Sequence, residues 1–268
     1  MESQYVHGYS RRESRRLRDQ ASTLEELLHD TVLYPEGSRV LEAGCGVGSQ
    51  TVILARRSPG ARFVCIDRSG DSLARAQEAC RRKGLSNVEF HQADIMNLEF
   101  AEGEFDHVFI CFVLEHLPDP AGALQRLSRV LRDGGTLTAI EGDHGSFYCY
   151  PETAESRHVV NCLVEVQARL GGDSLIGRRL YPLLTGAGLR DVRVEPRMVY
   201  VDSSRPHLVE GFSKNTFTAM VEGAREKAFE FALTDERQWE KGIADLYRAT
   251  EEDGVFCYTF FRGRGVAD

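Results

Sequence analysis

The spacing of hydrophobic and polar positions changes along the chain, and the change predicts an α/β fold. From residue 38 onward, short apolar runs alternate with amphipathic helical stretches, a pattern typical of a parallel sheet. The strands predicted in this region are 39–41, 63–66, 88–90, 108–114 and 136–140. The helix before the last of them starts with an N-cap and a proline at Asp119-Pro120, and Gly134-Gly135 are expected to end it. Its apolar face consists of Leu124, Leu127 and Leu131.

The chain on either side of this region is predicted to be mostly helical. Residues 10–13 have the form of a capping box, and apolar residues recur at helical spacing up to Leu28. The arginines of this helix are typical of a solvated face rather than of a membrane surface. Pro196 lacks an N–H donor, so the strand that contains it is expected at a sheet edge. Later helices are predicted at 153–170, 174–186, 206–231 and 235–250, and strands at 192–201 and 255–261.

Together these elements predict one doubly wound, Rossmann-like sheet with added helices. Residues 1–36 are expected to form an N-terminal helical cap, and residues 37–142 the Rossmann-like core. Residues 143–252 are expected to form helical lid insertions around the sixth strand, and residues 253–268 the last strand of the core sheet. A lid of this kind excludes water and shapes an acceptor pocket.

Charge and cysteine usage narrow the class of partner. The net charge of −8 disfavours nucleic acid, and the longest apolar run, 108–114, is too short to span a membrane. Seven cysteines without a C-x-x-C pair indicate buried thiols in a reducing compartment and no metal site. We therefore expect a cytoplasmic enzyme with a small-molecule substrate, and the sequence leaves open whether it forms a homodimer.

A glycine-rich turn follows the first strand of the core. Residues 40–48 read V-L-E-A-G-C-G-V-G, and glycines let a ligand approach the backbone closely. Ser49 stands where a dinucleotide fingerprint requires Gly or Ala. The pattern therefore favours an adenosyl group without a pyrophosphate, and a nicotinamide-dependent dehydrogenase is the runner-up. Glu42 is a candidate either for holding the α-ammonium of a methionine moiety or for orienting the loop.

Two more acids stand at the ends of the next strands. Asp67 ends the second strand, where a carboxylate accepts hydrogen bonds from ribose hydroxyls. Asp94 follows the third strand and is a candidate for the adenine amine, with Ile95 against the ring. Either acid alone is typical of a helix cap. Acids at the ends of successive strands indicate a nucleoside site.

Four segments, L-E-A-G-C-G-V-G, I-D-R-S, Q-A-D-I and F-V-L-E-H-L, resemble those of class I S-adenosylmethionine-dependent methyltransferases. The similarity to the ubiquinone-biosynthesis-like branch covers residues 37–141. It implies S-adenosylmethionine as the cofactor and a seven-stranded sheet in the order 3-2-1-4-5-7-6, with the seventh strand antiparallel. Arg68 replaces an apolar family residue, and its guanidinium plane is expected to stack on adenine. The cofactor-binding residues implied are Glu42, Gly44, Cys45, Gly46, Gly48, Asp67, Arg68, Asp94, Ile95 and Cys111.

The tips of the fifth and sixth strands carry the candidates for catalysis, because ligands bind beyond the carboxyl ends of parallel strands. The predicted catalytic residues are Glu141, Asp143, His144 and Tyr200. Methyl transfer depends mainly on positioning, and a base is needed only for an acidic proton. His144 is then the candidate base, oriented by an adjacent carboxylate; a role in merely bonding a loop is equally open. The predicted substrate-binding residues are Tyr9, Tyr148, Tyr181 and Asp202, with ordinary packing as the alternative for the tyrosines.

The predicted function is S-adenosylmethionine-dependent methyl transfer to a metabolite or natural product. Two alternatives stay open, since a fold does not determine a reaction. One is an enzyme that uses the cofactor for cyclisation or another non-methyl displacement. The other is a protein that binds the cofactor without turnover.

Overall fold

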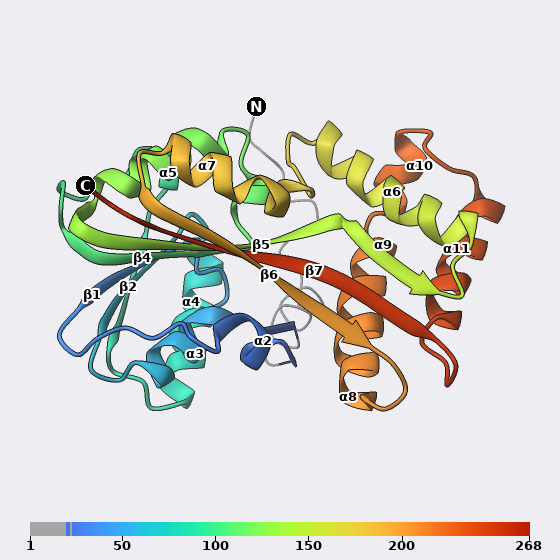
Figure 1. Ribbon diagram of the computed structural model, residues 1–268, viewed down its shortest axis with the longest axis horizontal. Helices are drawn as coiled ribbons and strands as arrows, with labels where there is room; N and C mark the ends of the chain where they lie inside the picture. The colour runs from blue at the N-terminus through green and yellow to red at the C-terminus, as the bar shows by residue number, and fades with distance from the viewer. Residues whose placement is uncertain (1–19, 22) are drawn as a thin grey trace. The chain divides into compact units, whose positions relative to one another are not determined.

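The computed structural model describes residues 20, 21 and 23–268, and its strands form a seven-stranded sheet. The strand order is β3-β2-β1-β4-β5-β7-β6 (Figure 1), which confirms the predicted fold class and order. β6 stands at the edge, as Pro196 predicted. The strands are β1 Arg39–Ala43, β2 Arg62–Asp67, β3 Val88–Gln92, β4 Phe105–Cys111, β5 Leu131–Tyr150, β6 Arg190–Val201 and β7 Val255–Val266.

The chain forms two compact units. The core unit comprises Leu28–Glu141, Ile176–Pro196 and Phe261–Asp268. The helical unit comprises Gly142–Leu175, Arg197–Phe260 and the described residues before Leu28. β5, β6 and β7 each contribute residues to both units.

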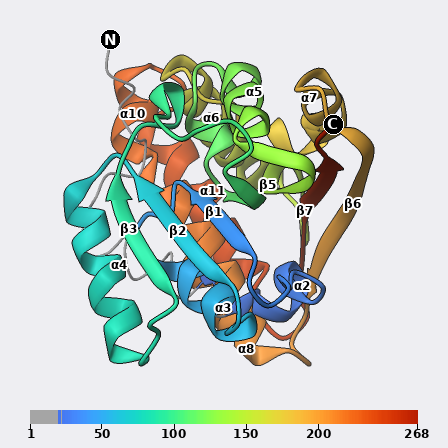
Figure 2. The ribbon, with the colours of Figure 1, turned by 90° about the vertical axis from the view of Figure 1, so that its left-hand side faces the viewer.

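Helices cover both faces of the sheet in the core unit. α3 (Ser49–Arg57) and α4 (Gly70–Arg82) lie on one face, and α5 (Pro120–Arg129) and α7 (Leu180–Gly186) on the other (Figures 1 and 2). The short elements of this unit are η1 Ile95–Asn97, η2 Leu114–His116 and η3 Ile176–Arg179, together with the end of α2 Glu25–His29.

The predicted C-terminal end of α5 was wrong. The helix starts as expected, with the Asp119 carboxylate accepting a hydrogen bond from the Gly122 N–H at 2.8 Å. It ends at Arg129 instead of before Gly134, and Leu131 already pairs with Phe105 of β4. Leu131 is buried in the core as a strand residue, and an apolar residue four positions after Leu127 also fits a helix, so its spacing could not separate helix from strand.

The register of the parallel strands places their carboxyl ends at one level. Ala43 at the end of β1 is paired with Ile66 of β2 and with Ile110 of β4. Cys111 at the end of β4 is paired with Ile140 of β5. The segments that follow these strands therefore start at one edge of the sheet, where parallel α/β sheets bind ligands.

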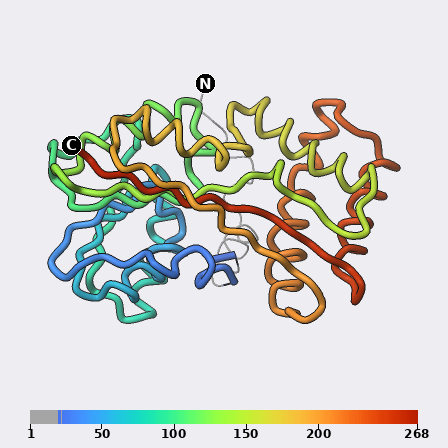
Figure 3. The backbone as a smooth tube through the Cα atoms, viewed as in Figure 1, coloured from blue at the N-terminus to red at the C-terminus, as the bar shows by residue number. Residues whose placement is uncertain are grey.

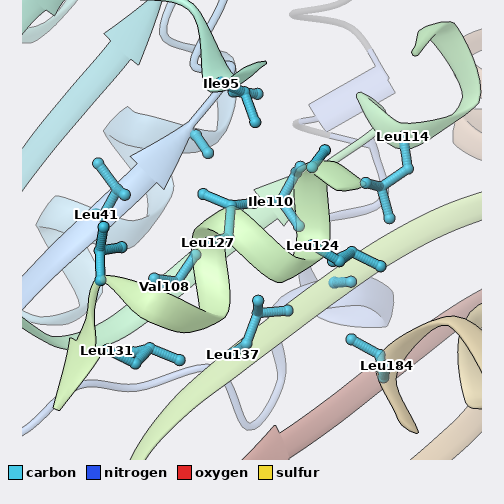
Figure 4. Packing of buried hydrophobic residues seen from close by; sticks show 14 of the residues in the cluster. Leu41, Ile95, Val108, Ile110, Leu114, Leu124, Leu127, Leu131, Leu137 and Leu184 are labelled. Atoms are coloured by element: carbon cyan, nitrogen blue, oxygen red, sulfur yellow. The ribbon is translucent and has the colours of Figure 1, made fainter. Parts of the chain in front are cut away.

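The hydrophobic core of this unit lies between the sheet and α5 (Figure 4). Leu41 and Val108 come from neighbouring strands, and Leu124 and Leu127 from the helix; all four are 0% exposed. Leu127 is one turn of helix from Leu124, so the two residues of the predicted stripe that lie on the helix do face the sheet, whereas Leu131 belongs to β5.

β7 runs antiparallel to β5. Near the start of β5, the Gly135 carbonyl accepts from the Ala267 N–H at 2.8 Å, and the Gly134 N–H donates to the Ala267 carbonyl at 3.0 Å. Further along β5, the Ser146 hydroxyl accepts from the Thr259 N–H at 2.9 Å. Figure 3 shows the chain end of β7 beside the start of β5. The direction implied by the family resemblance is therefore correct.

The helical unit contains α6 Ala154–Arg169, α8 Pro206–Leu208, η4 Val209–Thr218, α9 Ala219–Gly223, α10 Arg225–Glu230 and α11 Glu236–Arg248. The single helix predicted for 206–231 is a series of segments, of which η4 is a π-helix. Its wide turn suits two side-chain hydrogen bonds to carbonyls five residues earlier, from Thr216 to Gly211 and from Thr218 to Ser213.

β5 is longer than predicted and continues through 141–150 into the helical unit. Phe147 and Cys149 are buried there, whereas Tyr148 and Tyr150 are 47% and 63% exposed. This alternation is the two-residue period of a strand, and the polar start of the segment conceals it in the sequence.

Most of the predicted N-terminal helix lies outside the described residues; Gln20, Ala21, Thr23 and α2 are the helical positions that can be described. Across 20, 21 and 23–268, no helix has the length and apolar character needed to cross a membrane.

The close packing of the glycine-rich turn on α4 generates a first prediction. Gly48 has φ +78°, and a Cβ there would lie 2.9 Å from the backbone of Ala76. Gly84 has φ +68° but open space around the same position. Gly84→Ala should lower the free energy of unfolding by about 1 kcal/mol, through backbone strain alone. Gly48→Ala should lower it by a further 1–3 kcal/mol or so, because α4 must move.

Urea unfolding of the two variants beside the wild type measures the difference. Equal losses in the two variants would show that the turn tolerates a side chain against α4.

Candidate functional site

The glycine-rich turn after β1 is held by the end of β2. Gly44 adopts φ +76°, and its N–H donates to the Ile66 carbonyl at 2.8 Å. The Gly46 N–H donates to Oδ2 of Asp67 at 2.9 Å, and the Ser69 N–H donates to Oδ1 at 2.8 Å. Each carboxylate oxygen keeps acceptor capacity beyond these bonds. Asp67 therefore fixes the turn and can still accept hydrogen bonds from a ligand.

The turn is closed on one side and open on another. A Cβ on Gly44 would lie 2.5 Å from Cγ2 of Val113, in the loop after β4. A Cβ on Gly46 would have no described atom within 4 Å. The open side at Gly46 is where a ligand can approach the backbone.

Glu42 is a buried carboxyl one strand position before the turn. It is 2% exposed, and its Oε2 accepts a hydrogen bond from the Cys65 thiol at 3.4 Å. Burial raises the pKa of Glu42 from 4.5 to about 7, the negative charge of Asp67 adds to the rise, and the Cys65 bond opposes it. A cation bound beside Glu42 would favour its ionised form.

The residues predicted for the adenine end lie at the ends of β2 and β3. Oδ1 of Asp94 accepts from the Met96 N–H at 2.8 Å, and Asp94 caps η1. Ile95 is 7% exposed and belongs to the hydrophobic core. Arg68 is exposed, and its carbonyl accepts from the Gln92 side chain at 2.9 Å. Contacts of these three residues with adenine stay predictions.

Cys111 ends β4 among acids. Its thiol is buried, and burial raises its pKa well above the ordinary value. The negative charges of Glu141, Glu42 and Glu115 raise it further, in that order. Such a thiol stays protonated, which argues for packing beside a ligand rather than for a nucleophile. Cys45 in the turn is likewise buried, with a raised pKa from the same cause.

Glu141 is fully buried in the middle of β5. Its Oε1 accepts from the Val113 N–H at 3.0 Å and from the Leu114 N–H at 2.8 Å. Burial raises the pKa of Glu141 well above the ordinary value, the charge of Glu115 raises it further, and the hydrogen bonds of the loop amides oppose the rise. The hydrogen-bond partners of this carboxyl are therefore backbone amides of the loop after β4.

In the helical unit, His144 is buried. Nδ1 of its ring lies 2.7 Å from the Tyr258 hydroxyl, and its backbone N–H donates to the Ser174 carbonyl at 2.9 Å. A Cβ on Gly142 would overlap the same hydroxyl, so a side chain there would have to displace Tyr258. The Asp143 carboxylate accepts from the N–H of Gly145 at 3.0 Å. Nδ1 of the imidazole thus lies beside a phenol. Orientation of His144 by an adjacent carboxylate stays a prediction.

The other predicted acceptor-side residues are more exposed. Tyr148 and Tyr200 in the helical unit are 47% and 40% exposed, and Tyr181 on α7 of the core unit is 57% exposed. The Asp202 carboxylate accepts hydrogen bonds from the hydroxyl and the N–H of Ser204, which lower the pKa of Asp202. Bonds of this kind are typical of an aspartate that stabilises a turn. Tyr9 lies outside the described residues.

Metal ligation finds no support within the described part of the chain: no group of three or more His, Cys, Asp or Glu residues there is arranged to hold an ion.

Two residues of these arrangements were not predicted. Tyr258 stands 114 positions from His144, in a strand whose aromatic residues indicated only burial. Val113 belongs to an apolar run, and nothing in the run indicated its contact with Gly44. The one sequence signal that could have indicated a hydrogen bond by Tyr258 was its hydroxyl, which stands in a strand otherwise rich in phenylalanine.

Comparisons with known proteins agree with this geometry. The family model described as a methyltransferase domain matches residues 41–139. An uncharacterized 37.1 kDa protein of a Streptomyces fradiae transposon is 33% identical over 208 residues, which are 76% of this chain and 59% of that protein. A trans-aconitate 2-methyltransferase of Deinococcus radiodurans is 34% identical over 167 residues, 60% of this chain and 58% of that protein. The chain thus spans less than two thirds of the length of these relatives.

Among solved structures, the YcgJ protein of Bacillus subtilis is similar with a TM-score of 0.59 at 16% identity. The match covers 92% of this chain and 98% of that protein. At this identity the similarity concerns the fold.

The raised pKa of Glu42 generates a second prediction. A carboxyl whose pKa rises on folding stabilises the folded state fully below its unfolded pKa, near 4.5, and that contribution is lost as the pH rises through about 7. Glu42→Gln removes this loss. The unfolding free energy of the variant should therefore increase relative to the wild type by about 2 kcal/mol between pH 5 and pH 8.

Urea unfolding without ligand at the two pH values measures this change. Glu89→Gln, at an exposed carboxyl on β3, is the control and should show little change relative to the wild type. A Glu42→Gln difference that does not vary with pH would mean that Glu42 is ionised throughout.

Proposed function

Because the chain belongs to the class I S-adenosylmethionine-dependent methyltransferases, we propose that it transfers the methyl group of S-adenosylmethionine to a small-molecule acceptor. Family membership confirms the resemblance seen in the sequence, S-adenosylmethionine as the cofactor, and the methyltransferase class at the level of the domain. The reaction of the whole chain and its acceptor are the proposal.

One observation carries the proposal: the Asp67 carboxylate holds the Gly46 N–H at the open side of the turn. A carboxylate at this place can accept ribose hydroxyls with its remaining lone pairs. Glu42, buried one position before the turn, would face the methionine ammonium, and Asp94 the adenine amine. These residue types fit an adenosyl sulfonium without a pyrophosphate.

The cofactor, when bound, supplies a methyl group that its sulfonium already activates. The protein's task is then to position the acceptor in line and to exclude water. Residues 143–252 are proposed to serve as the lid for this purpose. Asp143, Tyr200, Tyr148, Tyr181, Asp202 and Tyr9 are proposed to line the acceptor side.

A small acceptor is supported by two observations. The net charge of −8 disfavours nucleic acid, and the Deinococcus relative is named for a small tricarboxylate. A cytoplasmic location belongs to the same proposal, and whether the chain is a homodimer stays open.

Calorimetry and product analysis test the proposal together. S-adenosylmethionine and S-adenosylhomocysteine should bind with micromolar-range affinity, about −8 kcal/mol, and NAD should not. With trans-aconitate as the first acceptor tried, S-adenosylhomocysteine should accumulate. Methylthioadenosine would indicate loss of the aminobutyryl group instead. Binding without turnover across acids, quinols and amines would indicate a binding protein.

Asp67 supplies the third prediction. Asp67→Ala should weaken S-adenosylhomocysteine binding by about 1–3 kcal/mol, because ribose hydroxyls lose their acceptor and the Gly46 N–H loses its partner. Asp71→Asn, at an exposed acid in the first turn of α4, is the matched control and should bind as the wild type does. Unchanged calorimetric affinity in a folded Asp67→Ala protein would refute the ribose assignment.

His144 supplies the fourth prediction. If His144 removes a proton from the acceptor, His144→Gln should lower turnover roughly 10²-fold and leave cofactor affinity within about twofold. Tyr258→Phe keeps the ring and removes the hydroxyl that bonds Nδ1, so it should lower turnover less. Steady-state rates and calorimetry measure both effects. A Gln variant with a near-normal rate would leave His144 a positioning role only.

A further inference from the structure

The loop after β4 is held by a single buried carboxyl group. Glu141 is 0% exposed, and one of its oxygens accepts two consecutive backbone amides, Val113 at 3.0 Å and Leu114 at 2.8 Å. The other oxygen, Oε2, is buried without a hydrogen-bond partner among the described residues. One acid thus satisfies two amide donors that the loop cannot pair within itself.

The same loop contains a residue in an unfavourable backbone conformation. Phe112 has φ +57°, a region that residues other than glycine rarely adopt. Its N–H donates to the Ile140 carbonyl at 2.9 Å, so three consecutive amides bond to neighbouring residues in the middle of β5. A strained residue persists where its surroundings determine its conformation. Glu141 accepts two of the three hydrogen bonds that hold the backbone at and after Phe112.

The held loop contacts the glycine-rich turn through Val113. A Cβ on Gly44 would lie 2.5 Å from Cγ2 and 3.1 Å from Cγ1 of Val113, so the valine side chain rests directly on the Gly44 backbone. Gly44 in turn is bonded through its N–H to Ile66 of β2. A displacement of Val113 would therefore uncover the turn on its closed side.

We propose that Glu141 is a positioning residue, which fixes the loop after β4 and, through Val113, the glycine-rich turn that takes the cofactor. The expected effect on cofactor binding rests on the proposed function, whereas the hydrogen bonds that fix the loop do not depend on it. The role differs from that of a partner to a catalytic histidine, because it is exerted on backbone amides.

The electrostatics of the site are compatible with a neutral clamp. Burial and then the nearby charge of Glu115 raise the pKa of Glu141 and favour its protonated form, while the hydrogen bonds from the loop amides oppose the rise. A neutral carboxyl keeps Oε1 as an acceptor and avoids an unpaired buried charge. Glutamine has the same shape and the same acceptor, and it should replace Glu141 in this role.

Amide hydrogen exchange of the protein without ligand tests the clamp directly. In Glu141→Ala, exchange at Val113 and Leu114 should accelerate at least tenfold relative to the wild type, while Glu141→Gln should stay within about threefold. Glu104→Ala is the matched control, because Glu104 also accepts a backbone amide, from Ala101 at 2.8 Å, but in a partly exposed turn. Unchanged exchange in a folded Glu141→Ala protein would overturn the clamp.

Calorimetry with S-adenosylhomocysteine tests the coupling to the turn. Glu141→Ala should weaken binding at least tenfold, Glu141→Gln should restore it to within about threefold of the wild type, and Glu104→Ala should not change it. A loss of binding in Glu104→Ala equal to that in Glu141→Ala would indicate a general loss of stability and overturn the proposal. If Glu141→Ala does not fold, the Val113→Ala variant tests the coupling to the turn in its place.

Val113→Ala keeps the amide bonds but removes the side chain that rests on Gly44. It should weaken binding at least threefold while exchange at Leu114 stays as in the wild type. Equal affinity in Val113→Ala and the wild type would overturn the coupling. Absence of binding to the wild type would instead count against the proposed function, and the exchange experiment would still decide the clamp.

Discussion

The parallel pairing of β1 with β2 and β4 is the constraint on which the candidate cofactor site depends. Because Ala43 is in register with Ile66 and with Ile110, three chain segments leave the sheet at one level. A residue directly after any of these strands is thereby brought to the same edge. The hydrogen bond from the Gly46 N–H to Asp67 exists because this register puts the end of β2 beside the turn after β1. A shift of one residue would also turn every side chain of a strand to the opposite face.

The same register gathers acidic groups in a place that water does not reach. Glu42 and Glu141 are both buried, and the pKa of each is raised by burial first and by a neighbouring acid second. Cys111 lies in the field of both. Without a ligand, burial and the neighbouring acids favour the protonated forms of these groups. A cationic ligand would reverse that preference at Glu42, whereas Glu141 is engaged with loop amides.

In the helical unit, the aromatic residues of β7 and η4 enclose the imidazole of His144. Its ring lies 5.8 Å from that of Tyr258 and 6.2 Å from that of Phe217, centre to centre. An enclosed imidazole has a fixed orientation, which suits either a base or a structural hydrogen bond. Nδ1 of His144 lies 2.7 Å from the Tyr258 hydroxyl, so this phenol takes part in fixing the ring.

The sequence by itself determined the features that repeat over short distances. The alternation of apolar runs and helical stretches predicted the doubly wound sheet, Pro196 predicted the edge strand, and the glycine-rich turn with Asp67 predicted a nucleoside site. Each of these follows from the chemistry of neighbouring residues: the period of a helix or strand, a missing N–H, or a backbone that needs no side chain. The family resemblance extended the prediction to the strand order.

Tertiary structure alone decided which groups meet. Oε1 of Glu141 accepts amides of a loop 27 and 28 positions earlier in the chain, contacts that the local sequence pattern does not indicate. His144 is bonded to a residue 114 positions later, and the helix predicted over 206–231 is divided by a π-helix whose threonines bond carbonyls five residues back. Such partners are set by strand register and by the space that packing leaves. Neither quantity is present in the local pattern of a single chain.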